Sequence, residues 1–194
     1  MMKEQSIKRQ LQVHVEVLNQ TIAQNEPLII ELVDCLCQCF QQGNKLMLCG
    51  NGGSAADAQH VAAEFVNRFG FDRDALPALA LTTDSSILTC IGNDSAFENI
   101  FSRQVQALGN QADILVGIST SGKSANVLKA LDIARSKGVI TIGFTGEKGL
   151  DFMGGKCDYC LAIPSSDTAR IQEAHEFIWH VICGAVERQL FPNG

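Results

Sequence analysis

Long apolar runs and clusters of basic residues are both absent from this sequence of 194 residues. A membrane-spanning helix needs about 20 consecutive apolar residues, so no membrane segment is expected. The first twelve residues are polar and lack the apolar centre of a secretory signal. The 15 Lys and Arg are scattered and outnumbered by 21 Asp and Glu, so the net charge of −6 provides no general attraction for DNA or RNA. These features favour a cytoplasmic protein that binds neither nucleic acid nor membrane.

Charged residues make up only 19% of the chain and aromatic residues 6%, whereas 46% is hydrophobic. A typical globular chain is about a quarter charged. Part of the surface is therefore expected to be buried against other copies of the chain, because obligate oligomer contacts are apolar. The 17 glycines suit a fold with many tight turns between strands and helices.

Eight cysteines are present, and most lie in apolar stretches that are typical of a protein core. Reduced thiols in a cytosolic protein are therefore the simplest interpretation. Cys157 and Cys160 form a single C-x-x-C. Without a second pair this is a weak signal for zinc or redox chemistry, and no role is assigned to it.

The hydrophobic pattern predicts two helices followed by alternating strands and helices. The first helix covers 3–24, and the second covers 26–42, begins at Pro27 and ends at Gly43. Apolar residues cover more than one face of the second helix, so a partner subunit is expected to pack on it. Strands are expected at 45–49, 79–82, 113–118, 139–145 and 159–163. Helices are expected at 54–69, at 97–108 and at 168–190, with one more that begins at about 85 and one that follows 119–124 and ends at 137.

This alternation predicts a parallel sheet covered by helices on both faces. We expect one three-layer α/β/α domain over residues 1–194, with a five-stranded parallel sheet and N-terminal helices. No internal repeat, low-complexity segment or linker interrupts it.

Two loops at the carboxyl ends of predicted strands are expected to bind a ligand. Gly50–Ser54 is rich in glycine, which lets the backbone approach a ligand closely. Ser119–Ser124 supplies four hydroxyls directly before a helix, whose N–H groups and dipole favour an anion. A phosphate is the predicted ligand, and a serine-rich helix cap without a ligand is the alternative.

The second loop also matches a nucleotide-binding pattern. Gly117, Gly122, Lys123 and Ser124 fit G-x-x-x-x-G-K-S. The density of Ser and Thr and the lack of a convincing acidic strand partner for Mg²⁺ disfavour an NTPase.

Titratable residues recur on two predicted helices. His60 and Glu64 are four residues apart and share one helix face, so they could bind a metal or move protons. Such a pair is, however, more often a surface interaction. Gln172 and His180 are eight residues apart and point within a quarter turn of each other.

Four strings carry a resemblance to a known family: CGNGGSAADAQHVAAEFVNRF, LTCIGNDSAFENIFSRQV, GISTSGKSANVLKA and ARIQEAHEFIWH. Together they resemble the sugar isomerase (SIS) domain, and within it the phosphoheptose isomerases, over nearly the whole chain. The resemblance implies a flavodoxin-like SIS fold and an aldose–ketose isomerase. Its reaction would convert sedoheptulose 7-phosphate to D-glycero-D-manno-heptose 7-phosphate through an enediol, in ADP-heptose and lipopolysaccharide core biosynthesis.

The resemblance also implies an assembly and a cofactor. It implies a homotetramer with active sites between subunits, in which residues 1–43 form the central helix bundle and 44–194 the α/β core. One Zn²⁺ per subunit is implied, and its identity in cells is open.

The site residues follow from the resemblance, motif by motif. The zinc set is His60, Glu64, Gln172 and His180, and the acid/base pair is Glu64 and His180. A carboxylate and an imidazole can move the protons that an isomerisation requires, and zinc can stabilise an enediolate. The substrate-binding set is Asn51, Gly52, Gly53, Glu64, Arg68, Asn93, Asp94, Ser119, Thr120, Ser121, Ser124 and Gln172.

Two non-enzymatic alternatives exist within the same fold. The DnaA initiator-associating protein keeps the SIS scaffold but acts as a binding protein, and residues 168–170 and 190–192 look somewhat like it. In that relative the positions that match Glu64 and His180 are not an acid/base pair, whereas both residues are present here. A sugar-phosphate-sensing regulator is the third class, and such proteins usually add a DNA-binding domain.

Overall fold

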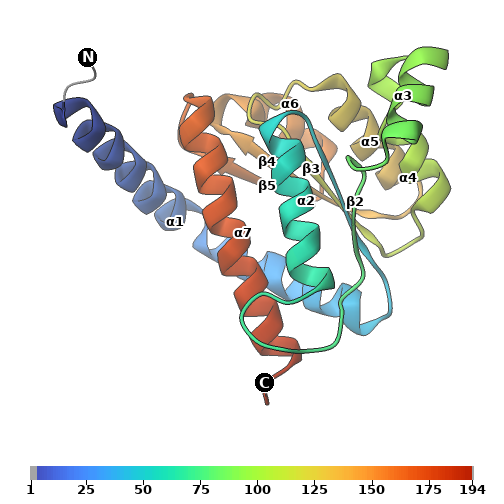
Figure 1. The fold of residues 1–194 in the computed structure, drawn as a ribbon, viewed down its shortest axis with the longest axis horizontal. Helices are drawn as coiled ribbons and strands as arrows, with labels where there is room; N and C mark the ends of the chain where they lie inside the picture. The colour runs from blue at the N-terminus through green and yellow to red at the C-terminus, as the bar shows by residue number, and fades with distance from the viewer. Residues whose placement is uncertain (1–3, 194) are drawn as a thin grey trace.

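A long N-terminal helix leads into a sheet that is covered by helices on both faces (Figure 1). The computed structural model describes residues 4–193. The five strands are all parallel, in the order β2-β1-β3-β4-β5. The predicted flavodoxin-like three-layer fold is therefore confirmed. The strands are β1 Leu46–Gly50, β2 Ala78–Ala80, β3 Ile114–Ile118, β4 Ile140–Gly146 and β5 Tyr159–Ile163.

Seven α-helices and three 3₁₀ turns are found among residues 4–193. The α-helices are α1 Glu4–Gln41, α2 Gly53–Val66, α3 Ser85–Asp94, α4 Ser102–Leu108, α5 Ala125–Ser136, α6 Leu150–Met153 and α7 Thr168–Leu190. The 3₁₀ turns are η1 Phe97–Asn99, η2 Glu147–Gly149 and η3 Gly154–Lys156. The predicted helix at 97–108 is thus divided into η1 and α4.

Each face of the sheet has its own hydrophobic core. Alternate residues of a strand point to opposite faces. Leu46 and Leu48 of β1 accordingly pack in one core with α1, α2 and α7, whereas Met47 and Cys49 pack in the other with α4 and α5. Helices α2 and α7, which carry the predicted metal ligands, therefore lie on the same side of the sheet.

The predicted boundary between two N-terminal helices is wrong, because α1 continues through Pro27. Pro27 cannot donate a hydrogen bond to the carbonyl of Ala23, and an interior proline costs about 3 kcal/mol. Burying an aliphatic side chain contributes about 1.5–3 kcal/mol, and Leu32 and Leu36 are both buried one turn or more beyond the proline. Tertiary packing therefore outweighs the local signal. Residue 3, where the first helix was expected to begin, lies outside the described residues.

The first half of α1 projects from the body of the molecule (Figure 1). Ile7, Leu11 and Val15 follow one another at four-residue spacing and are 59%, 62% and 46% exposed. Residues at this spacing share one helix face. The projecting half of α1 therefore presents an uncovered apolar stripe. Among the described residues, no helix has the length and apolar character needed to cross a membrane.

Candidate functional site

Two loops meet at the carboxyl edge of the neighbouring strands β1 and β3. The side-chain amides of Asn51 and Asn126 hold them together with reciprocal hydrogen bonds of 2.9 and 2.8 Å. Gly52 has φ of +56°, a conformation that favours glycine. The loops that were predicted to bind a ligand are therefore adjacent and fixed to each other.

The serine-rich loop opens into a pocket of about 210 Å³. Two predicted residues, Thr120 and Ser121, line this pocket. Ser119 is buried, and its hydroxyl lies 2.9 Å from that of Ser124. The Ser124 side chain makes no capping hydrogen bond to α5, so helix capping does not account for a serine at this position. Lys123, which also belongs to the predicted loop, lines the pocket too. The remaining lining residues were not predicted and are Lys148, Ser165, Ser166, Thr168 and Ile171.

Gly122, which belongs to the nucleotide-binding pattern, has a structural role that does not involve a nucleotide. It has φ of +68°, and a Cβ at this position would lie 2.4 Å from the backbone of Gly149. The glycine is therefore required for the loop to pack on η2.

Helices α2 and α7 lie side by side and bring two histidines together (Figure 1). Nε2 of His60 lies 2.9 Å from Nε2 of His180. Oε1 of Glu176 lies 3.0 Å from the first of these nitrogens and 3.4 Å from the second. These three residues form a group whose ligand atoms all lie within 4.8 Å of one another. Glu176 was not among the predicted site residues.

Glu64 and Gln172 lie beside this group and have other partners. Oε1 of Glu64 is 3.7 Å from Nδ1 of His60, on the other side of the imidazole from Glu176. Nε2 of Gln172 donates a hydrogen bond of 3.4 Å to Asp57. Gly53 makes room for Gln172, since a Cβ on Gly53 would lie 2.2 Å from Nε2 of Gln172.

Asp57 is a second acidic residue that the sequence did not reveal. It is buried, and burial raises the pKa of its carboxyl group to about 6. The charge of Glu176 raises this pKa further, while the hydrogen bond from Gln172 and the proximity of His60 lower it. Asp57, Gln172 and Glu176 line one pocket of about 440 Å³. The i, i+3 spacing of Asp57 and His60 and the i, i+4 spacing of Glu176 and His180 are the signals that would have predicted both acids.

Three predicted substrate residues have polar partners other than the histidines. Arg68 is exposed and pairs with Asp72 at 3.4 Å. The side chains of Asn93 and Asp94 are hydrogen-bonded to each other at 2.8 Å on exposed α3. No hydrogen bond or ion pair between described residues joins these three to His60 or His180.

His175 belongs to the core rather than to the site. It is fully buried, packs edge-on against Phe144 and has Nε2 at 3.2 Å from the carbonyl of Thr145. Burial lowers the pKa of its imidazole to about 4, so it is neutral at pH 7.

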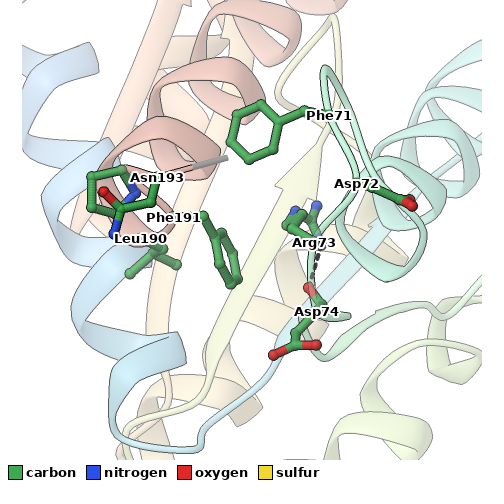
Figure 2. A pocket seen from close by; sticks show the side chains of 8 residues that line it. Phe71, Asp72, Arg73, Asp74, Leu190, Phe191 and Asn193 are labelled. Carbon is green, nitrogen blue, oxygen red and sulfur yellow. Dashed lines mark hydrogen bonds between the residues drawn. The ribbon is translucent and has the colours of Figure 1, made fainter.

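A third pocket, of about 690 Å³, lies between the loop at 71–74 and the C-terminal residues 190–193 (Figure 2). Arg73, which lines this pocket, donates a hydrogen bond of 2.9 Å to the carbonyl of Asp74. None of the predicted site residues lines this pocket, so its larger volume does not make it the candidate site.

The histidine group offers donors that could hold a metal ion. Two imidazole nitrogens and one carboxylate oxygen are donors that Zn²⁺ takes. Bonds of about 2.0–2.2 Å at tetrahedral angles place ligand atoms about 3.3–3.5 Å apart. The observed separations of 2.9, 3.0 and 3.4 Å need only a small opening to admit the ion.

Comparison with known proteins identifies the family of this chain. The profile of the SIS domain matches residues 11–146. The chain is 51% identical over 189 residues to a phosphoheptose isomerase of Aneurinibacillus thermoaerophilus, covering 96% of this chain and 95% of that protein. The fold matches the phosphoheptose isomerase of Neisseria gonorrhoeae with a TM-score of 0.88 at 39% identity, covering 95% of this chain and 98% of that one. It matches the enzyme of Francisella tularensis with a TM-score of 0.91 at 34% identity, covering 97% and 100%. The chain therefore belongs to the SIS-domain family, within which it is a sugar-phosphate isomerase of the phosphoheptose isomerase group.

Proposed function

We propose that this enzyme converts sedoheptulose 7-phosphate to D-glycero-D-manno-heptose 7-phosphate, a precursor of ADP-heptose in lipopolysaccharide core biosynthesis. The observation that carries the proposal is the meeting of Glu64, His60 and His180 on α2 and α7. Helix α2 begins at Gly53, within the glycine-rich segment of the site. Relatives named phosphoheptose isomerase at 51% identity support the same reaction.

The proposed reaction moves one proton between adjacent carbons. Glu64 removes a proton from C1 of the ketose, and His180 protonates the carbonyl oxygen at C2, which gives the C1–C2 enediol. A proton is then returned to C2 while the hydroxyl at C1 loses its proton, which leaves an aldehyde at C1. A carboxylate and an imidazole are suited to these transfers near neutral pH.

The phosphate is proposed to bind at the serine-rich loop. Thr120 and Ser121 line the pocket there, and Lys123 and Lys148 supply positive charge. The start of α5 directly after this loop adds backbone N–H groups and a favourable dipole. Binding the phosphate here holds the sugar at the carboxyl edge of the sheet.

One Zn²⁺ per subunit is part of the proposal, with His60, Glu64, Gln172 and His180 as the ligands implied by the resemblance. When bound, the ion would supply a Lewis acid for the substrate oxygens. The acidic residue at 176 adds a further donor beside the two histidines.

We also propose a cytoplasmic homotetramer with active sites between subunits. Arg68, Asn93 and Asp94 are exposed and make no polar contact with His60 or His180 among the described residues, so a neighbouring subunit is a natural way to complete the site. The apolar stripe on α1 is suited to a helix bundle between copies. All eight cysteines are free thiols, as in a reducing compartment.

The test is turnover of sedoheptulose 7-phosphate by the purified protein, with and without added Zn²⁺, measured as formation of heptose 7-phosphate. Glu64→Gln keeps the shape of the side chain but removes the base, so we expect turnover to fall by about 10²-fold or more. Glu98→Gln, at an exposed glutamate, is the matched control. Near-normal turnover in Glu64→Gln would remove Glu64 from the mechanism. No turnover by folded, zinc-supplied wild-type tetramer would instead favour a binding role like that of the DnaA initiator-associating protein.

A further inference from the structure

The C-x-x-C motif brings two thiols together over one glycine. Cys157 follows η3, and a Cβ on Gly143 of β4 would lie 2.9 Å from its Sγ atom. Cys160 is the register partner of Gly143 in the neighbouring strand β5. Paired residues of adjacent strands are about 4.8 Å apart and present their side chains on the same face of the sheet. Cys157 accordingly belongs to the core on that face, and Cys160 packs against it. The missing side chain of Gly143 leaves room for both sulfur atoms.

A chain of two hydrogen bonds runs through these thiols. Cys157 donates a hydrogen bond of 3.1 Å to the carbonyl of Met153, at the end of α6. The thiols of Cys157 and Cys160 are also hydrogen-bonded to each other. This second bond lowers the pKa of Cys157 and outweighs burial, whereas it raises the pKa of Cys160 together with burial. Because the thiolate is the reactive form of cysteine, Cys157 is the nucleophile of the pair.

Residues 147–156 connect the motif to the pocket at the serine-rich loop. They form η2, α6 and η3 of three or four residues each, which is far below the roughly 12 that an isolated helix needs to be stable. Contacts with the rest of the protein therefore hold this segment in place. Lys148 lines the pocket, and a Cβ on Gly149 would lie 2.9 Å from the backbone nitrogen of Gly122. At the other end, Met153 is fully buried and accepts the hydrogen bond from the motif.

We propose that Cys157 and Cys160 form a peroxide-sensitive dithiol, and that their oxidation to a disulfide loosens residues 147–156 beside the pocket. The Cys157 thiolate attacks one oxygen of hydrogen peroxide, the O–O bond breaks, and a sulfenic acid and hydroxide form. Cys160 loses its proton, and its sulfur attacks the sulfur of Cys157 and displaces a second hydroxide, which forms the S–S bond. The protons of the two thiols convert both hydroxides to water. The thiols are thus oxidised by two electrons, and the peroxide is reduced to two water molecules.

The structure gives this reaction both access and a consequence. Cys157 is 8% exposed and Cys160 is partly buried, so a reagent as small as hydrogen peroxide can reach the pair. The disulfide has no S–H group, so the carbonyl of Met153 loses its hydrogen bond from Cys157. Both cysteines are free thiols in this structure, and disulfides of reducing compartments are usually transient or redox-sensing. The proposed switch is therefore reversible by a thiol reductant.

Peptide mapping tests the chemistry independently of turnover. The full-length protein is treated with hydrogen peroxide, its remaining thiols are blocked with iodoacetamide, and it is digested with trypsin. Cleavage after Lys156 and Arg170 gives a peptide that contains Cys157, Cys160 and no other cysteine. We expect this peptide to be two hydrogen atoms lighter and not alkylated. Treatment with dithiothreitol before blocking should restore alkylation of both cysteines.

Hydrogen exchange measures the effect on residues 147–156. Exchange of their amides should rise by about 2- to 10-fold on oxidation, which corresponds to the loss of one hydrogen bond. Cys157→Ser keeps a donor for the carbonyl of Met153 but cannot form the disulfide, so peroxide should not change its exchange. Cys160→Ser leaves Cys157 without a second thiol, so excess peroxide should carry Cys157 to sulfinic acid, which dithiothreitol does not reverse. Cys90→Ser removes an exposed thiol outside the motif and should behave as wild type.

The exposed Cys90 also calibrates the oxidation within each digest. The hydrogen bond with Asp94 and the charge of this carboxylate raise the pKa of the Cys90 thiol, so it should react after the motif. Full alkylation of Cys157 and Cys160 once Cys90 is oxidised would overturn the proposal. A disulfide that leaves the exchange of residues 147–156 unchanged would overturn it as well, as would a peroxide-induced rise in Cys157→Ser. None of these results depends on turnover of a heptose phosphate, so the switch and the proposed reaction can fail separately.

Discussion

Glu187, near the end of α7, holds the loop that joins α2 to β2. Its carboxylate accepts hydrogen bonds from the backbone N–H groups of Phe69 and Gly70 at 3.0 and 2.6 Å and from Nε of Arg73 at 3.0 Å. The side chains of Glu187 and Arg73 are both only 2% exposed. The ring of Phe69 lies 5.5 Å from that of His180, so this contact also supports the candidate site.

Glu187→Gln keeps the size of the side chain and removes its charge. Both carboxylate oxygens accept hydrogen bonds from N–H groups. In the variant an NH₂ group replaces one of these oxygens, and it faces an N–H donor whose hydrogen bond it cannot accept. Arg73 also loses its buried counter-charge. Breaking a buried pair by removing one partner costs about 3–5 kcal/mol, and for a chain of this length each kcal/mol lowers Tm by about 2–4 °C. We therefore expect Tm to fall by about 6–20 °C.

The assay is thermal and denaturant unfolding at one protein concentration, because subunit association would make the midpoint concentration-dependent. Glu98→Gln is the exposed control and should change stability by less than about 0.5 kcal/mol. A loss below about 1 kcal/mol in Glu187→Gln would refute the role assigned to the ion pair.

The pH dependence of the same two proteins gives a second check. Burial raises the pKa of Glu187, but the hydrogen bonds from Phe69, Gly70 and Arg73 outweigh it and hold the pKa below its usual value. A lowered carboxyl pKa stabilises the fold above the unfolded-state pKa of about 4.3, and this contribution is lost as pH falls through the folded-state pKa. The difference between wild type and Glu187→Gln should therefore narrow below about pH 4. A constant difference down to pH 3 would contradict the charge argument.

Two further predictions concern the phosphate loop and α1. Ser121→Ala combined with Ser124→Ala should raise KM for the sugar phosphate by about 10-fold or more and change kcat little, because phosphate contacts act in the ground and transition states alike. A loss of kcat at unchanged KM would count against the phosphate site. Ile7→Lys combined with Leu11→Lys should shift the assembly to smaller species in light scattering, because these side chains are 59% and 62% exposed on one face of α1. Helix content should be retained. An unchanged particle mass would contradict a helix bundle formed through this stripe.

The strands were predictable from the sequence because each is a short apolar run that ends at a turn. Strands β1, β3, β4 and β5 lie within one residue of the expected ranges, whereas β2 ends two residues earlier than expected. The continuation of α1 through Pro27 was not predictable, since local propensity does not include the burial of Leu32 and Leu36 in the folded protein. The short turns η2, α6 and η3 were also missed, because these ten residues contain three glycines and lack a helical period.

The site was only partly predictable, for a different physical reason. Helix periodicity placed His60 with Glu64, and Gln172 with His180, but it gave no information on which faces of α2 and α7 meet. Only the packed structure shows that Glu176 lies beside both histidines and that Asp57 accepts a hydrogen bond from Gln172.

The distance between the histidines is fixed by the core rather than by the site itself. Trp179, the residue before His180, is fully buried and stacks on Phe144 of β4 with ring centroids 4.8 Å apart. Successive helix residues are about 100° apart, so seating Trp179 in the core turns His180 toward α2. On α2, Val61 is fully buried and follows His60 directly, which fixes that side chain in the same way. Each histidine is therefore attached to a neighbour that cannot rotate without opening the core, and the separation of their Nε2 atoms follows from how α2 and α7 pack on one face of the sheet.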